Sequence, residues 1–173
     1  MEPFTAKRIL VVGCPGAGKS TFARKLRDAT GLPLYYLDML YHHPDRTTAP
    51  REEFDAALTK ILSQDEWIID GCYLRTLPIR LERAELVFFL DYPQEVCLAG
   101  AASRIGHPRE DMPWIESEFD PEFRQYIIDY SVDQLPRMRT LLSQAQSQGS
   151  IDIITFTTRE EADSFITSFL TRH

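Results

Sequence analysis

Short apolar runs alternate along this chain with longer segments in which apolar residues recur every three or four positions. The short runs are rich in Val, Ile, Leu and aromatic residues and have the length of buried strands. The longer segments have the period of helices that bury one face. This pattern predicts five strands, over residues 9–12, 32–37, 67–69, 86–90 and 151–156.

Several of the predicted helices carry recognisable boundary signals. Pro50 opens a helix over residues 51–62, and Asp120 has the form of an N-cap. Pro136 must kink or split the helical segment in which it stands, and residues 158–161 form a capping box for the last helix. Shorter helices are predicted over 77–82 and 93–103, and polar or aperiodic connections over 41–50, 104–118 and 144–150.

The alternation of strands and helices is typical of a parallel sheet covered by helices on both faces. In such a sheet, ligands bind beyond the carboxyl ends of the strands. The first four predicted strands are followed there by Gly13, Asp38, Asp70 and Asp91. We therefore expect an α/β fold with its functional site at this edge of the sheet.

Residues 13–20 read Gly-Cys-Pro-Gly-Ala-Gly-Lys-Ser and match the pattern G-x-x-x-x-G-K-[ST] between a predicted strand and a predicted helix. In this context the backbone N–H groups of the loop and the positive end of the helix bind the phosphates of a nucleoside triphosphate. Lys19 is placed to reach the β- and γ-phosphates, and the Ser20 hydroxyl is placed to ligate Mg²⁺. The residues predicted to hold ATP are Gly13, Pro15, Gly16, Ala17, Gly18, Lys19, Ser20 and Thr21.

The composition excludes several classes of protein and several kinds of site. The 173 residues suffice for a single domain, and the net charge of −7 is opposite to the basic face of most nucleic-acid-binding proteins, so direct binding of nucleic acid is not expected. No apolar run is long enough to span a membrane, and we expect no signal peptide. The three cysteines are odd in number and far apart, which fits a cytoplasmic protein and argues against a zinc site or a disulfide framework. Nothing here predicts an oligomeric state.

Several stretches carry a resemblance to a known family: G-C-P-G-A-G-K-S-T, L-P-L-Y-Y-L-D-M-L-Y, W-I-I-D-G-C-Y-L-R-T-L and R-E-D-M. The chain resembles the P-loop small-molecule kinases of the adenylate kinase and shikimate kinase type, and within them the proteins named DNA topology modulation proteins. The resemblance implies a three-layer P-loop NTPase fold with a five-stranded parallel sheet in strand order 2-3-1-4-5. It also implies ATP and Mg²⁺ as cofactors, a substrate-binding segment at about residues 38–65 and a short lid at about residues 105–118.

The resemblance implies roles for two aspartates at the strand ends. Asp70 would hold Mg²⁺ through water, together with Ser20, although an aspartate before glycine is also common in simple turns. Asp38 would accept the proton of a substrate hydroxyl or orient the substrate, and its alternative role is a cap at the strand end. Tyr41 and Tyr73 are candidates for stacking on a substrate ring, and their alternative is packing at the sheet edge.

Three arginines are candidates for phosphate contacts, because a guanidinium binds phosphate oxygens with two parallel hydrogen bonds. Arg75 is similar to the arginine in the D-G-F-P-R-T motif of nucleotide kinases and would bind a substrate phosphate, or else be solvated. Arg104 at the start of the lid and Arg109 within it would close over ATP and stabilise charge on the transferred phosphoryl group. The chain departs from the family in having few lid arginines and in having Cys72 where an asparagine is usual.

Together these features predict an ATP-dependent kinase acting on a small-molecule phosphoryl acceptor, namely a nucleoside, a nucleoside monophosphate or a hydroxylated metabolite. A first alternative is a nucleotide-binding regulator, in which ATP changes the shape of the protein and a partner responds. A second alternative is a modulator of DNA topology, which would bind DNA with an affinity that depends on salt. The acidic net charge argues against this second alternative.

Overall fold

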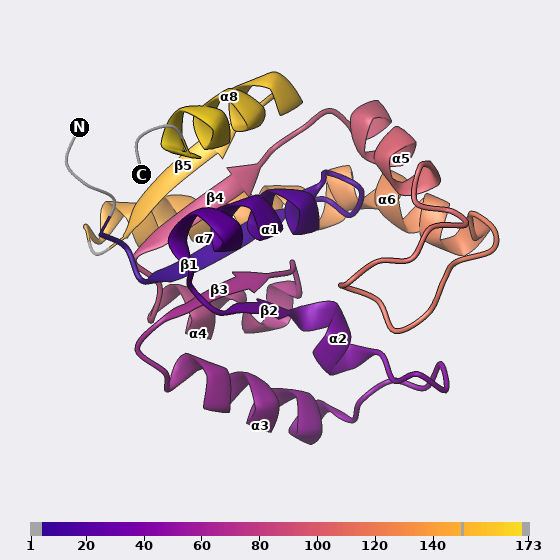
Figure 1. Cartoon of the computed structure of the whole chain (residues 1–173), viewed down its shortest axis with the longest axis horizontal. Helices are drawn as coiled ribbons and strands as arrows, with labels where there is room; N and C mark the ends of the chain where they lie inside the picture. Colours follow the sequence, from indigo (N-terminus) through magenta and orange to yellow (C-terminus); the bar gives the residue numbers. More distant parts are fainter. Residues whose placement is uncertain (1–4, 150, 171–173) are drawn as a thin grey trace.

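The computed structural model describes residues 5–149 and 151–170, and its centre is a five-stranded sheet. Within these residues all neighbouring strands are parallel, and their spatial order is β2-β3-β1-β4-β5 (Figure 1). The strands are β1 Arg8–Gly13, β2 Leu34–Tyr36, β3 Trp67–Asp70, β4 Leu86–Leu90 and β5 Asp152–Phe156. The predicted fold class and strand order are therefore confirmed.

The register of the sheet brings the candidate residues to one edge. Asp70 pairs with Val11 of β1 on one side and with Tyr36 of β2 on the other. Gly13, the last residue of β1, pairs with Leu90, the last residue of β4. The phosphate loop, the end of β3 and the end of β2 therefore open toward the same space.

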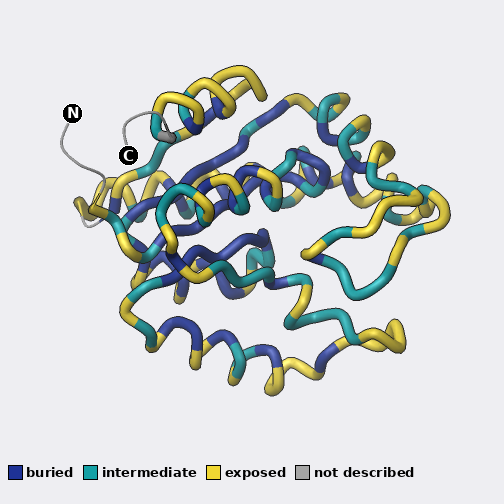
Figure 2. Tube along the Cα trace, viewed as in Figure 1, coloured by how far each residue is buried: buried dark blue, intermediate teal, exposed yellow. Residues whose placement is uncertain are grey.

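The core lies in the middle of the sheet, because β1, β3 and β4 are each covered on both faces. Every residue of β3 and β4 is buried, and Figure 2 shows the buried strands between helices whose outer sides are exposed. Continuous apolar runs such as Leu-Val-Phe-Phe-Leu in β4 are what a strand buried on both faces requires.

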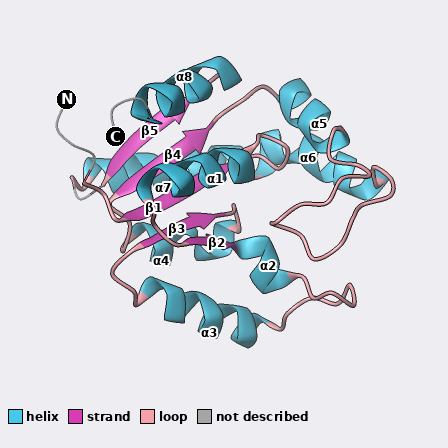
Figure 3. Ribbon diagram, viewed as in Figure 1, coloured by secondary structure: helices cyan, strands magenta, loops and turns pink. Residues whose placement is uncertain are grey.

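Helices cover both faces of the sheet. Helix α1 packs against α8 on one face, and α4 packs against α7 on the other (Figure 1). The helices are α1 Lys19–Thr30, α2 Leu37–Tyr41, α3 Arg51–Leu62, α4 Leu77–Leu81, α5 Gln94–Ala102, α6 Pro121–Asp133, α7 Leu135–Ser147 and α8 Arg159–Leu170, with a 3-10 turn η1 at Leu74–Thr76. The connection between α5 and α6 is a long loop beyond the carboxyl ends of the strands (Figure 3).

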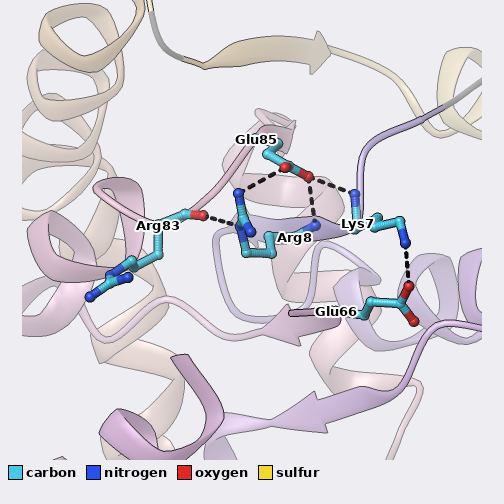
Figure 4. Close-up of polar contacts among 5 residues, drawn as sticks. All are labelled: Lys7, Arg8, Glu66, Arg83 and Glu85. Atoms are coloured by element: carbon cyan, nitrogen blue, oxygen red, sulfur yellow. Dashed lines mark hydrogen bonds and ion pairs between the residues drawn. The ribbon is translucent and has the colours of Figure 1, made fainter. Parts of the chain in front are cut away.

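Ion pairs hold the opposite, amino-terminal ends of the strands together. The Glu85 carboxylate accepts hydrogen bonds from the backbone N–H groups of Lys7 and Arg8 and from the Arg8 guanidinium, while Lys7 pairs with Glu66 at 2.7 Å (Figure 4). These contacts join the starts of β1, β3 and β4.

Most predicted boundaries agree with the structure. Pro136 splits its segment into α6 and α7, Asp120 caps α6 by accepting a hydrogen bond from the backbone N–H of Glu122, and the capping box forms between Thr158 and Glu161. None of the helices in the described residues is long and apolar enough to cross a membrane.

Two predictions were wrong at element ends. The second strand stops at Tyr36, and Leu37 and Asp38 begin the short helix α2, so the predicted strand over 32–37 was too long. The connection predicted from residue 144 begins later, because α7 continues to Ser147. Ser150, where that connection was predicted to end, lies outside the described residues.

Candidate functional site

The phosphate loop lies between β1 and α1 in a conformation that depends on glycine. Gly16 and Gly18 have φ angles of +87° and +94°, in the left-handed region that favours glycine. A Cβ on Gly16 would lie 1.9 Å from the Cys97 carbonyl oxygen, and one on Gly100 would lie 2.0 Å from the Gly16 carbonyl oxygen. The loop therefore packs against the backbone of α5 with no room for a side chain on either of these two glycines.

Lys19 begins α1 and is buried beneath the loop, where its Nζ donates a 3.1 Å hydrogen bond to the Cys14 carbonyl oxygen. Burial acts to lower the pKa of Lys19, but the neighbouring Cys72 and Asp70 outweigh this effect and raise the pKa above its ordinary value. Lys19 is therefore a fixed positive charge at the position from which a P-loop lysine reaches phosphate.

Two carboxylates meet at the Ser20 hydroxyl. Ser20 Oγ lies 2.6 Å from Asp70 Oδ2 and 3.0 Å from Asp111 Oδ2, and both aspartates are buried. Burial raises the pKa of Asp70 to about 6, against the opposing effect of Lys19. A hydroxyl has one proton and can satisfy only one of two carboxylates, so this cluster has more acceptors than donors.

This oxygen cluster fits Mg²⁺, which favours carboxylate, hydroxyl and water oxygens. Ser20 and Asp70 are the pair that the sequence predicted, and Asp111 brings a further carboxylate oxygen to the same hydroxyl. In the described residues no group of three or more His, Cys, Asp or Glu side chains is placed to hold a metal ion. The hydroxyl and two carboxylates therefore suit a magnesium ion that keeps several waters and is completed by phosphate oxygens.

Asp38 lies in α2 and is joined to the segment that follows β3. Its Oδ1 accepts a 2.7 Å hydrogen bond from the Tyr73 hydroxyl, which fixes the orientation of the carboxylate. Burial, reinforced by the Asp38 charge, raises the pKa of Tyr73, so this hydroxyl stays protonated and remains a donor. The rings of Tyr73 and Tyr41 lie next to each other, with centroids 5.5 Å apart.

A pocket of about 620 Å³ adjoins the phosphate loop at Gly16, Gly18 and Thr21 and is otherwise lined mainly by α5. A second pocket of about 690 Å³ adjoins the loop at Lys19 and Ser20 and extends beneath the 105–118 loop. Asp38, Tyr41, Asp70, Tyr73 and Arg109 all line the second pocket, as does Pro15.

Arg104, just after α5, lines both pockets. Burial and the nearby Arg109 lower its pKa, although an arginine remains charged at neutral pH. A cation at this position stands between the space next to the loop glycines and the space next to Asp38. The structure thus brings Arg104 together with the other predicted residues around the loop.

Arg109 is folded inward from the 105–118 loop. Its Nε lies 3.6 Å from Asp111 and its Nη1 lies 3.8 Å from Glu116. Among the described residues, this Nη1 is one of the buried side-chain nitrogens that make no hydrogen bond. A buried donor without a partner is costly, so Arg109 is ready to bind an oxygen that is brought into the pocket.

The structure places Arg75 away from this pocket. Its guanidinium is exposed and forms a two-bond ion pair with Asp55 of α3, at 2.6 and 3.1 Å. It lines another pocket, of about 230 Å³, which shares only Tyr41 and Tyr73 with the second pocket. Arg75 is therefore not brought together with the phosphate loop.

Three residues at or near the site were missed in the sequence. Asp111 stands in an aperiodic loop. Its stretch, R-E-D-M, was noted as part of the family resemblance, but no role was predicted for the aspartate itself. Arg159 donates to the Gly16 and Ala17 carbonyl oxygens from the start of α8, and no motif marks it. Arg80 is fully buried and donates to the carbonyl oxygens of Gly71, Cys72 and Tyr73, which holds the segment after Asp70 in place.

Comparison with known proteins supports the fold. No protein-family model and no curated protein matches the sequence. The structure is similar to the crystal structure of shikimate kinase from Bacteroides thetaiotaomicron, with a TM-score of 0.63 and 17% sequence identity, over 97% of this chain and 98% of that chain. The narrower resemblance to DNA topology modulation proteins has no counterpart in these comparisons. At this level of identity the likeness concerns the fold, and the chain has a P-loop kinase fold of the shikimate kinase kind.

Proposed function

We propose that this protein is an ATP- and Mg²⁺-dependent kinase that transfers the γ-phosphoryl group of ATP to a hydroxyl of a small molecule. The observation that carries the proposal is the second pocket. There the phosphate-loop residues Lys19 and Ser20 share one space with Asp38, Arg104 and Arg109. Phosphoryl transfer requires a site for phosphate, a carboxylate that can accept a proton, and cations that stabilise the negative charge on the transferred group.

The two pockets suggest where each reactant binds. ATP would place its base and ribose in the pocket beside Gly16, Gly18 and α5, with its phosphates on the backbone N–H groups of the loop. The acceptor would occupy the second pocket, on the Asp38 side of the loop. Arg104, which lines both, would then lie beside the phosphoryl group as it moves from donor to acceptor.

In the proposed reaction the acceptor hydroxyl gives its proton to Asp38, which Tyr73 holds in orientation. The hydroxyl oxygen bonds to the γ-phosphorus while the bond from that phosphorus to the β–γ bridging oxygen breaks, and ADP leaves. Lys19, Arg104 and Arg109 stabilise the negative charge that shifts during this step. Mg²⁺, held by Ser20, Asp70 and Asp111 with water, would neutralise charge on the phosphate oxygens.

The 105–118 loop acts as the lid in this proposal. It carries Arg109 and Asp111 to the phosphate loop, and its closure would keep water away from the γ-phosphate. A kinase without such exclusion would lose ATP to hydrolysis.

The test is ADP formation in the presence of Mg²⁺, measured across nucleosides, nucleoside monophosphates and hydroxylated metabolites. The rate is expected to rise with one class of acceptor and to vanish in Lys19→Met. Lys25→Met is the matched control, because this lysine lies on the same helix but is exposed and paired with Asp163. Turnover in Lys19→Met equal to that of the wild type would contradict the mechanism.

A further inference from the structure

An unbroken row of aromatic rings runs through the second pocket. Trp114 of the 105–118 loop contacts His42 with ring centroids 5.2 Å apart, His42 contacts Tyr41 at 4.9 Å, and Tyr41 contacts Tyr73 at 5.5 Å. All four line the pocket, and they are called the aromatic wall below. At its inner end, Tyr73 donates its hydrogen bond to Asp38. The wall therefore leads from the lid to the carboxylate that would accept the proton.

The charges around the pocket are unevenly placed. Its lining includes four cationic side chains, Lys19, Arg46, Arg104 and Arg109, and six carboxylates, Asp38, Asp70, Asp111, Glu116, Glu118 and Asp120. Without a bound phosphate, carboxylates therefore outnumber cations in the pocket lining.

Three of the four cations belong to the phosphate-loop end. Lys19 lies under the loop, and Arg104 also lines the pocket next to the loop glycines. Arg109 pairs with Asp111, which itself contacts the Ser20 hydroxyl. These three charges face the place where the triphosphate would bind, so ATP would occupy them.

Arg46 is the fourth cation, and it stands at the exposed rim. Its guanidinium lies over the Trp114 ring, 5.5 Å from the ring centroid. Its charge is open to water and screened by salt, so it is worth little to a ligand anion inside the pocket. Its stacking does extend the flat surface that Trp114 offers.

From this placement, and resting on the kinase function proposed above, we infer the class of the phosphoryl acceptor. The acceptor is an uncharged alcohol with a planar ring, the chemistry of a nucleoside, and not a phosphorylated or carboxylated compound. A ring of this kind would pack on the aromatic wall, while its hydroxyl would reach Asp38. A second phosphate or a carboxylate would be desolvated beside Asp38, and it would have to compete with the phosphates of ATP for Lys19 and Arg104, the cations that interact with Asp38.

The test compares four nucleosides with their own 5′-monophosphates, which share the ring and differ in charge, and with a cyclic hydroxy acid as a carboxylated alcohol. Phosphoryl transfer is measured as kcat/KM at saturating ATP and Mg²⁺. We expect at least one nucleoside to exceed its own monophosphate and the hydroxy acid by about tenfold or more, which is a difference of about 1.4 kcal/mol. Equal or faster transfer to a monophosphate or to the hydroxy acid would overturn the inference while leaving the kinase function intact.

Binding gives a readout that does not depend on turnover. Fluorescence of Trp114, obtained as the difference between the wild type and Trp114→Phe, is titrated with each compound in the presence of Mg²⁺ and a non-hydrolysable ATP analogue. A change with nucleosides, and none with their monophosphates at the same concentrations, supports the inference even if no transfer occurs and the kinase function fails. The reverse order, or no response to any nucleoside, would overturn it.

A pair of variants separates stacking from a general effect on the lid. Trp114→Leu is expected to raise KM for the nucleoside about tenfold without changing KM for ATP. Ile115→Ser is the matched control, since Ile115 is the next residue of the same loop, is 50% exposed and does not line the pocket. Equal changes in the acceptor KM for both variants would show that the ring does not bind on the aromatic wall. An unchanged acceptor KM in Trp114→Leu would show the same.

Discussion

Ser20 at the start of α1 and Asp111 in the 105–118 loop are joined by a 3.0 Å hydrogen bond across 91 positions of the chain. The contact ties the proposed lid to the phosphate loop. Because Asp70 lies 2.6 Å from the same hydroxyl, the lid brings a second carboxylate to the place where Mg²⁺ would bind. In the proposed mechanism, closure of the loop and binding of the metal would therefore be linked through Asp111.

The first prediction is that Asp111→Asn weakens magnesium binding. Loss of one of the two carboxylates lowers the negative charge at the site, so the Mg²⁺ concentration needed for half-maximal binding of the ATP analogue should rise about 10-fold. Isothermal titration with Mg²⁺ at a fixed concentration of the analogue measures this shift.

Glu110→Gln is the control for this prediction. Glu110 is the adjacent carboxylate of the same loop, but it contacts Arg27 and Tyr36 on the exposed side and not Ser20. An equal shift in Glu110→Gln would mean that Asp111 acts only by anchoring the loop.

The second prediction concerns the close approach of Gly100 to Gly16. An alanine in place of a glycine within a helix usually adds about 0.5–1 kcal/mol to stability. At Gly100 the new Cβ would lie 2.0 Å from the rigid Gly16 carbonyl oxygen, so Gly100→Ala should instead destabilise the protein by about 1–3 kcal/mol. It should also weaken ATP binding by displacing the loop.

Thermal unfolding and ATP titration check this outcome. Ala102→Ser, an exposed change on the same helix, should alter neither measurement. A gain in melting temperature for Gly100→Ala would show that the loop can move away from α5 without cost.

The third prediction is a pH dependence of stability in metal-free buffer. The pKa of Asp70 rises on folding to about 6, mainly because of burial, so the folded state favours the protonated form. The stabilising contribution of this group is complete below the unfolded pKa of about 3.9 and is lost as the pH rises through 6. Asp70→Asn carries no such charge.

The free energy of unfolding of Asp70→Asn minus that of the wild type should therefore increase by about 2 kcal/mol when the pH is raised from 4.5 to 7.5. Denaturant unfolding in EDTA at both pH values measures the gap. Asp55→Asn serves as the control, because the bond to Arg75 lowers the pKa of this exposed carboxyl and any effect has the opposite sign. A gap for Asp70→Asn that does not grow with pH would contradict the burial argument.

The fourth prediction concerns Arg80, which is fully buried under the Asp70–Tyr73 segment. Burial lowers its pKa to about 10, so it is charged at neutral pH and donates to three carbonyl oxygens after β3. Arg80→Met leaves these carbonyls without partners and should cost about 2–4 kcal/mol of stability. Arg83→Met, at an exposed position three residues on, should be close to neutral in the same unfolding experiment.

Much of the fold could be predicted from the sequence, because in most strands and helices the local sequence pattern agrees with the structure that the whole chain adopts. The apolar run of β4 was placed with its exact bounds, and the phosphate loop is marked by backbone requirements that few residues other than glycine meet. Pro136 and the capping box at Thr158 act within one turn of the chain, so their effects on helix ends were also foreseen.

The errors lie where local pattern does not decide the structure. Leu37 fits both a strand and a helix in the sequence, and in the structure it is buried in α2 with its side chain close to Gly71. The fold-back of Asp111 onto Ser20 joins positions far apart in an aperiodic segment. Arg80 is buried against the usual preference of arginine, so its position was missed. The ion pair between Arg75 and Asp55 was not foreseen either, and the substrate contact of Arg75 stays a prediction.

The central claim is transfer of the γ-phosphoryl group to a hydroxyl, and ³¹P NMR of the reaction mixture tests it most directly. With ATP, Mg²⁺ and the full panel of nucleosides, nucleoside monophosphates and hydroxylated metabolites, we expect a new phosphate monoester signal with at least one acceptor, growing in step with ADP, and no such signal with Lys19→Met. A signal of inorganic phosphate alone, or tight ATP binding with no new signal for any acceptor, would contradict the kinase assignment. The latter result would favour a nucleotide-binding regulator.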